Sequence, residues 1–322
     1  MKSNIYDVII IGGGPIGIAC AIEAKKNGLS NLVIEKGVLV NSVYHFPTNM
    51  TFFSTSQLLE IGDVPFIAHG DKPTRREALE YFRRVIQSWQ INVNVYEEVK
   101  NIMKNENGLF SVSSSKESYL AKNIIVATGF YDTANLLNIP GENLPKVKHY
   151  YDEPHPYVGQ KVVVIGAGNS AADVALETYL KGADVTLVMR ESEFKPSVKY
   201  WILPNVNNRI KEGSINAYFE SELTEIREKE VDIQTKEEKI TIKNDFVLAM
   251  TGYRPDYPLL EKFGILIGDD EFLEPSHNPD TLETNIPNVY LAGVVLGGLR
   301  TGRWFIENAR EHAEKIISNI LK

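Results

Sequence analysis

Three glycines near the N-terminus have the spacing of a loop that binds a dinucleotide. Gly12, Gly14 and Gly17 follow a continuous apolar run and precede a segment with apolar residues at helical spacing. In such a loop the first glycine permits a tight turn, the second lets the backbone approach a pyrophosphate, and the third allows close packing of strand and helix. Glu35 stands at the end of the next apolar run, where a carboxylate accepts hydrogen bonds from a ribose diol. The first 36 residues therefore predict a dinucleotide site.

The same loop occurs a second time, at Gly166, Gly168 and Ala171. Here the strand that follows ends at Arg190 and lacks the acidic residue. A carboxylate would repel a 2′-phosphate, whereas a guanidinium pairs with it. The second loop therefore favours NADPH over NADH. In the alternative, Arg190 is a solvated surface residue and Lys195 makes this pairing.

Two dinucleotide sites in one short chain suggest that one holds a fixed redox cofactor and the other a transient hydride donor, and FAD beside NADPH is the common solution. The first loop is assigned to FAD, because strands within 123–129 and 289–294 can close over an extended ligand there. The predicted FAD-binding residues are Gly12, Gly14, Pro15, Ile16, Gly17, Glu35, Lys36, Val99, Thr128, Gly129, Gly293 and Val294. The predicted NADPH-binding residues are Gly166, Gly168, Asn169, Ser170, Ala171 and Arg190.

The elements that must position these loops repeat along the chain. Residues 6–36 and 160–190 each have the pattern strand, tight turn, helix, strand, and Gly12 and Gly166 are 154 residues apart. Each unit is followed by a hairpin layer and an apolar strand ending in Thr-Gly, within 109–129 and 235–252. The last segment, from residue 288, has no counterpart in the second half and is predicted to complete the first domain.

The fold class follows from this repeat. We predict an α/β protein with two doubly wound, Rossmann-like dinucleotide-binding domains. The FAD-binding domain is discontinuous, with residues 1–130 and 256–322, and the NAD(P)H-binding domain spans 131–255. Between the two loops, Thr74 and Glu77 form a predicted capping box at the start of an amphipathic helix.

Composition excludes several kinds of partner. The 322 residues carry 34 basic and 42 acidic side chains, a net charge of −8 without basic runs, so nucleic acid is not expected. No apolar run is long enough for a membrane helix, and we see no signal peptide, which predicts a cytoplasmic protein. The one cysteine, Cys20, cannot form an internal disulfide, a CxxC redox pair or a cysteine-rich metal site. No metal is predicted.

The order of these motifs resembles the flavoprotein superfamily of low-molecular-weight thioredoxin reductases. Four longer segments resemble, more specifically, the bacillithiol-disulfide reductase family of FAD-dependent, NADPH-using bacterial enzymes. They are NSVYHFPTNMTFFSTSQLLEIGDVPF (41–66), LPKVKHYYDEPHPY (144–157), KPSVKYWILP (195–204) and FIENAREH (305–312). The resemblance covers essentially the whole chain and implies a thioredoxin reductase-like fold and a homodimer or higher homo-oligomer.

Three departures from that family concern the chemistry. Family members commonly carry a cysteine in the first glycine loop, where this chain has Ile16, and Cys20 lies one helical turn further along on the same face. Cys20 is interpreted either as a buried helix residue, which is favoured, or as a redox thiol. The second loop has Gly-Ala-Gly where the family tends to have Gly-Gly-Lys. The segment 297–304 carries two additional arginines, Arg300 and Arg303.

Without a CxxC pair, electrons must pass from NADPH to the flavin and then directly to an external acceptor. The first hypothesis is a small disulfide, bacillithiol disulfide or a related one. The residues expected near this substrate are Tyr44, His45, Phe53, Lys195, Lys199 and Trp201. The lysines would pair with its carboxylates, and the candidates for catalysis are Cys20, His45, Lys195 and Trp201. The alternative is that the aromatic residues pack between domains, the lysines are solvated and His45 is structural.

Other acceptors stay open at this point. Arg300 and Arg303 could face an acidic electron carrier such as ferredoxin or flavodoxin, and a quinone is a further candidate. A flavin monooxygenase is less favoured, because LPKVKH lacks the glycine of that class and His149 falls one position early. A flavin-bound redox sensor would turn over slowly with every acceptor.

Overall fold

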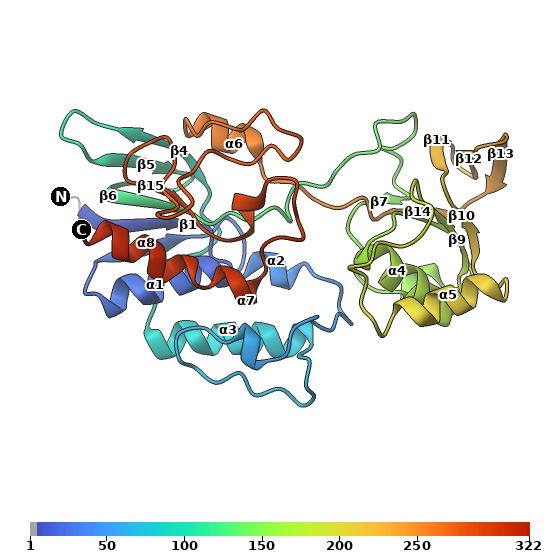
Figure 1. The fold of residues 1–322 in the computed structure, drawn as a ribbon, viewed down its shortest axis with the longest axis horizontal. Coiled ribbons are helices and arrows are strands. Elements are labelled where there is room, and N and C mark those ends of the chain that lie inside the picture. Colours follow the sequence, from blue (N-terminus) through green and yellow to red (C-terminus); the bar gives the residue numbers. More distant parts are fainter. Residues whose placement is uncertain (1–4) are drawn as a thin grey trace. The chain divides into compact units, whose positions relative to one another are not determined.

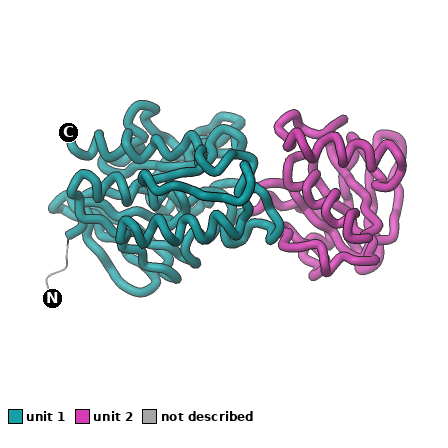
Figure 2. Tube along the Cα trace, turned by 90° about the horizontal axis from the view of Figure 1, so that it is seen from below, with its two compact units in different colours: residues 1–133, 253–322 teal, residues 134–252 magenta. Residues whose placement is uncertain are grey.

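The computed structural model describes residues 5–322, which form two compact units. Unit 1 comprises the chain up to Thr133 together with Tyr253–Lys322, and unit 2 is Ala134–Gly252 (Figure 2). These limits lie close to the expected domain boundaries at 130/131 and 255/256. Each unit contains its own sheet and its own glycine loop, so the predicted α/β class with two Rossmann-like units is confirmed.

Unit 1 is built on a seven-stranded sheet in the order β3-β2-β1-β6-β5-β4, with β15 also paired to β6 (Figure 1). Its strands are β1 (Ile5–Ile11), β2 (Asn31–Ile34), β3 (Val93–Asn94), β4 (Val99–Lys104), β5 (Phe110–Ser114), β6 (Ser118–Val126) and β15 (Val289–Leu291). β1 is parallel to β2 and β6, whereas β5 is antiparallel to β6 and β4. The C-terminal segment does complete this sheet, since β15 runs parallel to the last residues of β6.

Helices cover this sheet and bury its apolar strands. They are α1 (Pro15–Lys26), α2 (Asn41–Tyr44), α3 (Arg75–Trp89), α6 (Tyr257–Lys262), α7 (Ile306–Ala309) and α8 (His312–Ile320), with short 3-10 helices at Gln57–Leu59 and Gly293–Gly297. Val8–Ile11 of β1 are buried, as expected for a central parallel strand covered on both faces. The capping box of α3 is confirmed, because the Thr74 N–H donates to the Glu77 carboxylate (2.7 Å) and the Glu77 N–H donates to Thr74 Oγ1 (3.3 Å).

Unit 2 contains two sheets. A five-stranded parallel sheet has the order β10-β9-β8-β14-β7, and a three-stranded antiparallel sheet has the order β11-β12-β13. The strands are β7 (Val147–Lys148), β8 (Lys161–Ile165), β9 (Asp184–Val188), β10 (Asn216–Tyr218), β11 (Glu222–Ile226), β12 (Glu230–Gln234), β13 (Lys239–Lys243) and β14 (Phe246–Ala249). The helices are α4 (Asn169–Leu180) and α5 (Leu203–Lys211), with a 3-10 helix at His155–Tyr157.

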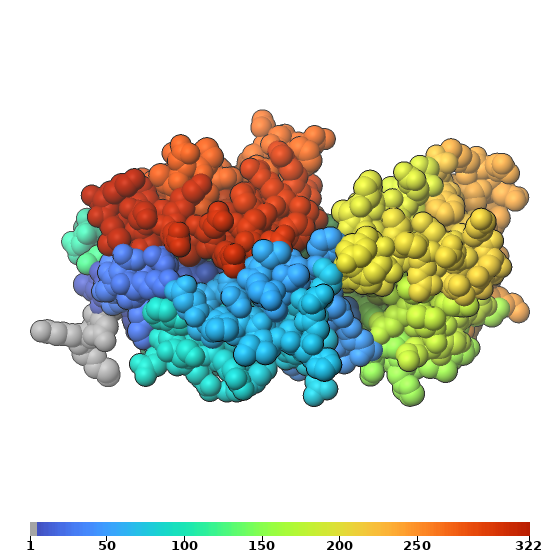
Figure 3. Space-filling view, turned by 60° about the horizontal axis from the view of Figure 1, so that its bottom comes forward, coloured from blue at the N-terminus to red at the C-terminus, as the bar shows by residue number. Residues whose placement is uncertain are grey.

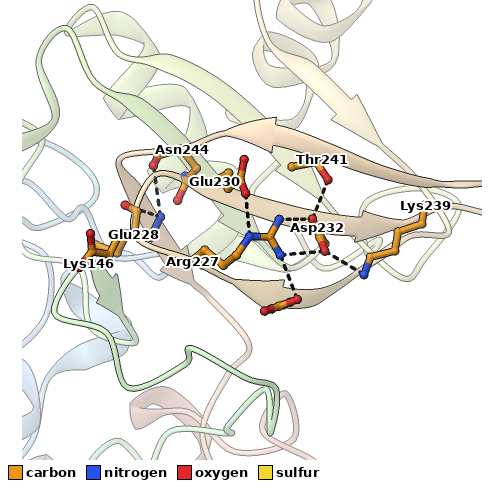
Figure 4. Close-up of polar contacts among 9 residues, drawn as sticks. Lys146, Arg227, Glu228, Glu230, Asp232, Lys239, Thr241 and Asn244 are labelled. Carbon is orange, nitrogen blue, oxygen red and sulfur yellow. Dashed lines mark hydrogen bonds and ion pairs between the residues drawn. The ribbon is translucent and has the colours of Figure 1, made fainter.

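A charged network holds the antiparallel sheet of unit 2 together (Figure 4). Asp232 accepts hydrogen bonds from Arg227 and from Thr241 (2.7 Å), and it forms an ion pair with Lys239 (2.8 Å). Arg227 also pairs with Glu230 (2.8 Å). Hydrogen bonds from these partners, Arg227 first, hold the pKa of Asp232 well below its usual range. Because Arg227 also pairs with Glu225 of β11 (2.9 Å), the network joins all three strands of this sheet.

Candidate functional site

The first glycine loop, between β1 and α1, leaves room for a ligand at one glycine only. Gly12 adopts φ 108°, and a Cβ atom there would stand 2.5 Å from the carbonyl oxygen of Ala127. A Cβ at Gly17 would stand 2.0 Å from the carbonyl oxygen of Gly12. Gly14, in contrast, has no atom within 4 Å of its Cβ position, and it lies at the N-terminus of α1. The outer glycines thus serve packing, while the middle one faces open space that suits a pyrophosphate.

Glu35 follows β2 and lies beside this loop. Its carboxylate accepts hydrogen bonds from the backbone N–H groups of Gly13 (2.7 Å) and Gly37 (2.8 Å). Burial raises the pKa of Glu35, and these two hydrogen bonds oppose that effect. A carboxylate oxygen accepts more than one hydrogen bond, so the side chain can still receive ribose hydroxyls. The neighbouring Lys36 forms an ion pair with Asp132 (2.9 Å).

Residues far apart in the sequence meet at this edge of the sheet. β1, β6 and β15 are parallel, so their carboxyl ends lie together. The Cβ position of Gly129 is 3.7 Å from Val294 Cγ2, and that of Gly293 is 3.3 Å from Ile16. Both glycines have positive φ. The predicted FAD-binding residues of the first loop, of the loop after β6 and of the turn after β15 are therefore neighbours.

For three other predicted FAD residues, the structure shows which element carries them and how it is connected to the site. Pro15 is the first residue of α1, and Thr128 precedes Gly129 in the loop after β6. Val99 is buried at the start of β4. It follows Glu97 by two positions, and the N–H of Glu97 donates to the carbonyl oxygen of Glu35 (2.9 Å).

The second glycine loop repeats this geometry in unit 2, between β8 and α4. Gly166 adopts φ 124°, and a Cβ atom there would stand 2.5 Å from the carbonyl oxygen of Met250 and 3.4 Å from Ala171 Cβ. Gly168 again has nothing within 4 Å of its Cβ position, at the N-terminus of α4. The small third residue, Ala171, is fully buried. Ser170 is exposed in the first turn of α4.

Two basic residues flank this second loop. Arg190 is exposed directly after β9 and Met189. The N–H of Lys195 donates to the carbonyl oxygen of Ala167 (2.9 Å), which ties the 195 segment to the loop. The Lys195 ammonium lies 3.6 Å from the Glu191 carboxylate, with both side chains well exposed. The N–H of Gly166 donates to the carbonyl oxygen of Val188 (3.0 Å), two residues before Arg190, so both predicted candidates for 2′-phosphate pairing belong to segments bound to this loop.

Lys199 does not have the setting expected of a substrate-binding lysine. Its side chain is buried and forms an ion pair with Asp173 of α4 at 2.6 Å. Asn169 fixes the same segment, accepting from the Lys199 N–H (2.8 Å) and donating to the Ser197 carbonyl (3.0 Å). Trp201 lies next to the Lys199 ammonium, 5.9 Å from ring centroid to Nζ. Lys199 and Asn169 thus hold the 197–201 segment against α4. The ammonium of Lys199 is already paired with Asp173, so it is not the free charge expected of a substrate-binding lysine.

The other substrate candidates belong to unit 1. Tyr44 and Phe53 are about half exposed, and Arg75 contacts the Tyr44 ring. His45 Nδ1 lies 2.9 Å from the Asn41 carbonyl oxygen, and the carbonyl of His45 accepts from the Tyr131 hydroxyl (2.9 Å). The segment carrying them, in blue in Figure 3, lies beside the red C-terminal segment, and Arg310 there donates to the Glu60 carbonyl (2.7 Å).

Cys20 has no access to a substrate. It is fully buried in α1, and burial raises the pKa of its thiol to about 12. A thiolate is the species that attacks a disulfide, and such a thiol supplies none at neutral pH. The structure therefore supports the interpretation of Cys20 as a helix residue and not as a redox thiol.

Replacement of Cys20 by alanine is expected to leave kcat/KM for reduction by a nicotinamide nucleotide within about twofold of the wild-type value. The loss of a buried sulfur should lower the free energy of unfolding by about 1 kcal/mol. Steady-state kinetics and thermal unfolding measure the two effects separately. A loss of turnover with the flavin still bound would contradict this interpretation and assign the thiol a role in the reaction.

His312 is a residue of this site that the sequence did not reveal. Its Nδ1 accepts a hydrogen bond from the N–H of Gly293 (3.1 Å), and its ring packs edge-on against Trp304, 4.5 Å between centroids. Burial lowers the pKa of His312 to about 4, so the ring is neutral at pH 7, as an acceptor must be. The FIENAREH motif contains this histidine, but nothing in its spacing indicates that it contacts Gly293.

Replacement of His312 by leucine should change how stability depends on pH. Because the folded pKa lies below the unfolded value of about 6.5, the wild-type protein loses stability as pH falls from 6.5 towards 4, by roughly 3 kcal/mol in total. The variant should be less stable at pH 7 and lack this part of the pH dependence. Thermal unfolding at pH 7, 6, 5 and 4 measures the gap between the two proteins. A gap that is constant across this range would contradict the assignment.

Within residues 5–322, no group of three or more His, Cys, Asp or Glu side chains is arranged to hold a metal ion. The helices in that range also include none with the length and apolar character to cross a membrane.

One glycine loop follows β1 in unit 1 and the other follows β8 in unit 2, and each opens a helix. This duplicated arrangement is typical of oxidoreductases that use a flavin together with a nicotinamide nucleotide. Residues 9–293 match the family model of pyridine nucleotide-disulphide oxidoreductases. The chain is 48% identical over 315 residues to "Bacilliredoxin reductase Bdr" of Bacillus subtilis strain 168, covering 98% of this chain and 97% of that protein. The chain therefore belongs to the bacillithiol-disulfide reductase family within the pyridine nucleotide-disulphide oxidoreductases, and the resemblance inferred from the motifs is confirmed.

Solved structures agree with this assignment. "Bacillithiol Disulfide Reductase Bdr (YpdA)" from Staphylococcus aureus superposes with a TM-score of 0.96 at 44% identity, covering 99% of this chain and 98% of that one. Thioredoxin reductase from T. acidophilum superposes with a TM-score of 0.78 at 21% identity, over 99% of both chains, which confirms the thioredoxin reductase-like fold. The chain is thus an enzyme that uses a flavin and a pyridine nucleotide.

Proposed function

We propose that this chain reduces bacillithiol disulfide, or another small disulfide, with NADPH and FAD and without a protein thiol. The overall reaction converts NADPH, one proton and the disulfide RSSR into NADP⁺ and two thiols RSH, so two electrons are transferred. The single observation that carries the proposal is Cys20, fully buried with a pKa of about 12, in a chain that retains both glycine loops.

FAD is assigned to unit 1. The open position at Gly14 and the N-terminus of α1 would receive the pyrophosphate, Glu35 the ribose, and Thr128, Gly129, Gly293 and Val294 the remainder. When bound, FAD would supply the chemistry of accepting a hydride and passing two electrons to a disulfide. The chain's contribution is to hold this turn rigid, since His312 accepts the Gly293 N–H and Ile16 packs against that glycine.

NADPH is assigned to unit 2. Gly168 and the N-terminus of α4 would receive its pyrophosphate, and Arg190 with Lys195 its 2′-phosphate. Both residues are cationic, and a phosphate dianion gains from each. We further propose that the protein acts in the cytoplasm as a homodimer or higher homo-oligomer, which is supported only by the sequence features and family resemblance given above.

The disulfide hypothesis is favoured over ferredoxin, flavodoxin, quinone and monooxygenase chemistry by the 44% identity to a solved structure named as a bacillithiol disulfide reductase. It is tested by mixing anaerobically NADPH-reduced protein with bacillithiol disulfide in a stopped-flow instrument and following flavin absorbance. Reoxidation should be much faster with the disulfide than with buffer. Equal rates would overturn the proposal, and faster reoxidation by ferredoxin or a quinone than by the disulfide would identify a different acceptor.

A further inference from the structure

Two arginines and one glutamate form an exposed cluster in unit 1, which we call the arginine pair with its counter-ion. Arg300 Nε lies 3.1 Å and Arg303 Nη1 2.9 Å from the same oxygen, Glu274 Oε1. The Arg300 guanidinium also lies 3.9 Å from the centroid of the Phe272 ring. Two positive charges share one negative charge, so the cluster keeps a net charge of +1. Each arginine side chain is about 40% exposed.

A guanidinium carries five N–H donors. Arg303 donates one of them to Glu274, whereas Arg300 forms an ion pair with the same carboxylate. Among residues 5–322, the structure gives neither guanidinium a further hydrogen bond. Both guanidinium groups are therefore held beside Glu274 while most of their N–H donors stay available to a ligand or to solvent. A planar carboxylate is the acceptor that matches a guanidinium fork, with two parallel hydrogen bonds.

The arginine pair is attached to the turn assigned to FAD. The Arg300 N–H donates to the carbonyl oxygen of Gly297 (2.8 Å), at the end of the 3-10 helix that begins at Gly293. The Arg303 guanidinium lies 5.1 Å from the Trp304 ring, and Trp304 packs on His312, which accepts the Gly293 N–H. Positive charge on Arg303 also contributes to the low pKa of His312. A series of contacts, Arg303 to Trp304, Trp304 to His312 and His312 to Gly293, therefore connects the arginine pair to this turn.

We infer that Arg300 and Arg303 recognise a carboxylate of the disulfide substrate, with Glu274 as the counter-ion that occupies them until substrate arrives. The inference deepens the proposed function and rests on it. Substrate specificity would then favour disulfides that carry carboxylates over neutral ones, because the pair offers a bidentate partner close to the flavin turn.

Charge around the cluster favours a small substrate over an acidic protein. Asp269, Asp270 and Glu271 precede Phe272 on the same loop, and the whole chain carries a net charge of −8. The field that a large acidic partner would meet at a distance is therefore negative, and such a partner gains no electrostatic steering. Only a group in direct contact with the arginines gains from their charge.

The test compares kcat/KM for bacillithiol disulfide with kcat/KM for its methyl esters, which lack the negative charges. The wild-type ratio of acid to ester should be about 10 or more. The double variant R300Q/R303Q should bring this ratio down about tenfold, whereas Arg76→Gln, which removes an exposed arginine from α3, serves as the matched control and should not change it. An unchanged ratio in the double variant would overturn the inference.

Glu274→Gln separates recognition from a merely structural role. If the arginines recognise substrate, removing their counter-ion makes them more available and the acid-to-ester ratio rises. If they only hold the 298–304 segment, Glu274→Gln acts in the same direction as the arginine variants and the inference is wrong. FAD content and melting temperature, measured for every variant, show whether the unit is folded.

The same measurements show whether the proposed function, this inference or both are wrong. If the wild-type protein reduces neither the acid nor the ester, both fall together. If it reduces both and the double variant keeps the wild-type ratio, only the inference falls. A double variant that is impaired towards ferredoxin but not towards the disulfide would show that an acidic protein is the partner, and would also overturn it.

Discussion

A Gly14→Val variant is expected to fold but to be purified without FAD. Gly14 has φ −72° and ψ 177°, which valine adopts without strain, and no protein atom lies within 4 Å of its Cβ position. The Cβ of the valine therefore has open space, and its methyl groups are expected to fill the space assigned to the pyrophosphate. The ratio of flavin to protein absorbance measures the outcome, and it should fall from near one FAD per chain to less than about one tenth, a loss of at least 1.4 kcal/mol under loading conditions.

The second loop provides the matched control for this substitution. Gly168 has φ −96° and ψ −173° and is equally open. Gly168→Val should keep its FAD and instead raise KM for NADPH by about tenfold or more, since the blocked loop is the one assigned to the nicotinamide cofactor. If Gly168→Val lost FAD and Gly14→Val raised KM for NADPH, FAD would belong to unit 2 and NADPH to unit 1. Loss of FAD in both variants would show a general folding defect, and circular dichroism would detect it.

An Arg190→Glu variant is expected to lose its preference for NADPH. A guanidinium paired with a 2′-phosphate contributes about 1.5–3 kcal/mol, and a carboxylate at that position repels the same group. KM for NADPH should rise about 10- to 150-fold, whereas KM for NADH should change little or fall. Steady-state kinetics with both nucleotides measure the ratio.

Two further variants show whether a change in KM for NADPH comes specifically from Arg190. Lys195→Gln tests the alternative that Lys195 makes the pairing, because its backbone is bound to the loop at Ala167. Lys181→Glu reverses an exposed charge at the far end of α4 and should leave both KM values unchanged. An equal effect of Arg190→Glu on NADPH and NADH would remove Arg190 from the nucleotide site.

Lys199 shows why the substrate site could not be predicted as well as the glycine loops. In the sequence it is a lysine near aromatic residues, and nothing local indicates that Asp173, on another element, lies 2.6 Å from its ammonium. The same holds for Glu274, which engages Arg300 and Arg303 from a different loop. The sequence gives the number of charged side chains. Which of them form ion pairs depends on which elements the fold brings together.

The sequence by itself determined the two glycine loops and the Rossmann-like class, because glycine spacing and apolar periodicity are local properties dictated by backbone sterics. The family was inferred separately, from the resemblance of four longer segments to known members. The capping box of α3 was readable for the same reason. Only the tertiary structure decided that Cys20 is inaccessible, that Lys199 is already paired, and that His312 accepts the N–H of Gly293, 19 residues earlier. Burial and long-range hydrogen bonds depend on how separate elements pack, and that packing has no signature in the spacing of residues along the chain.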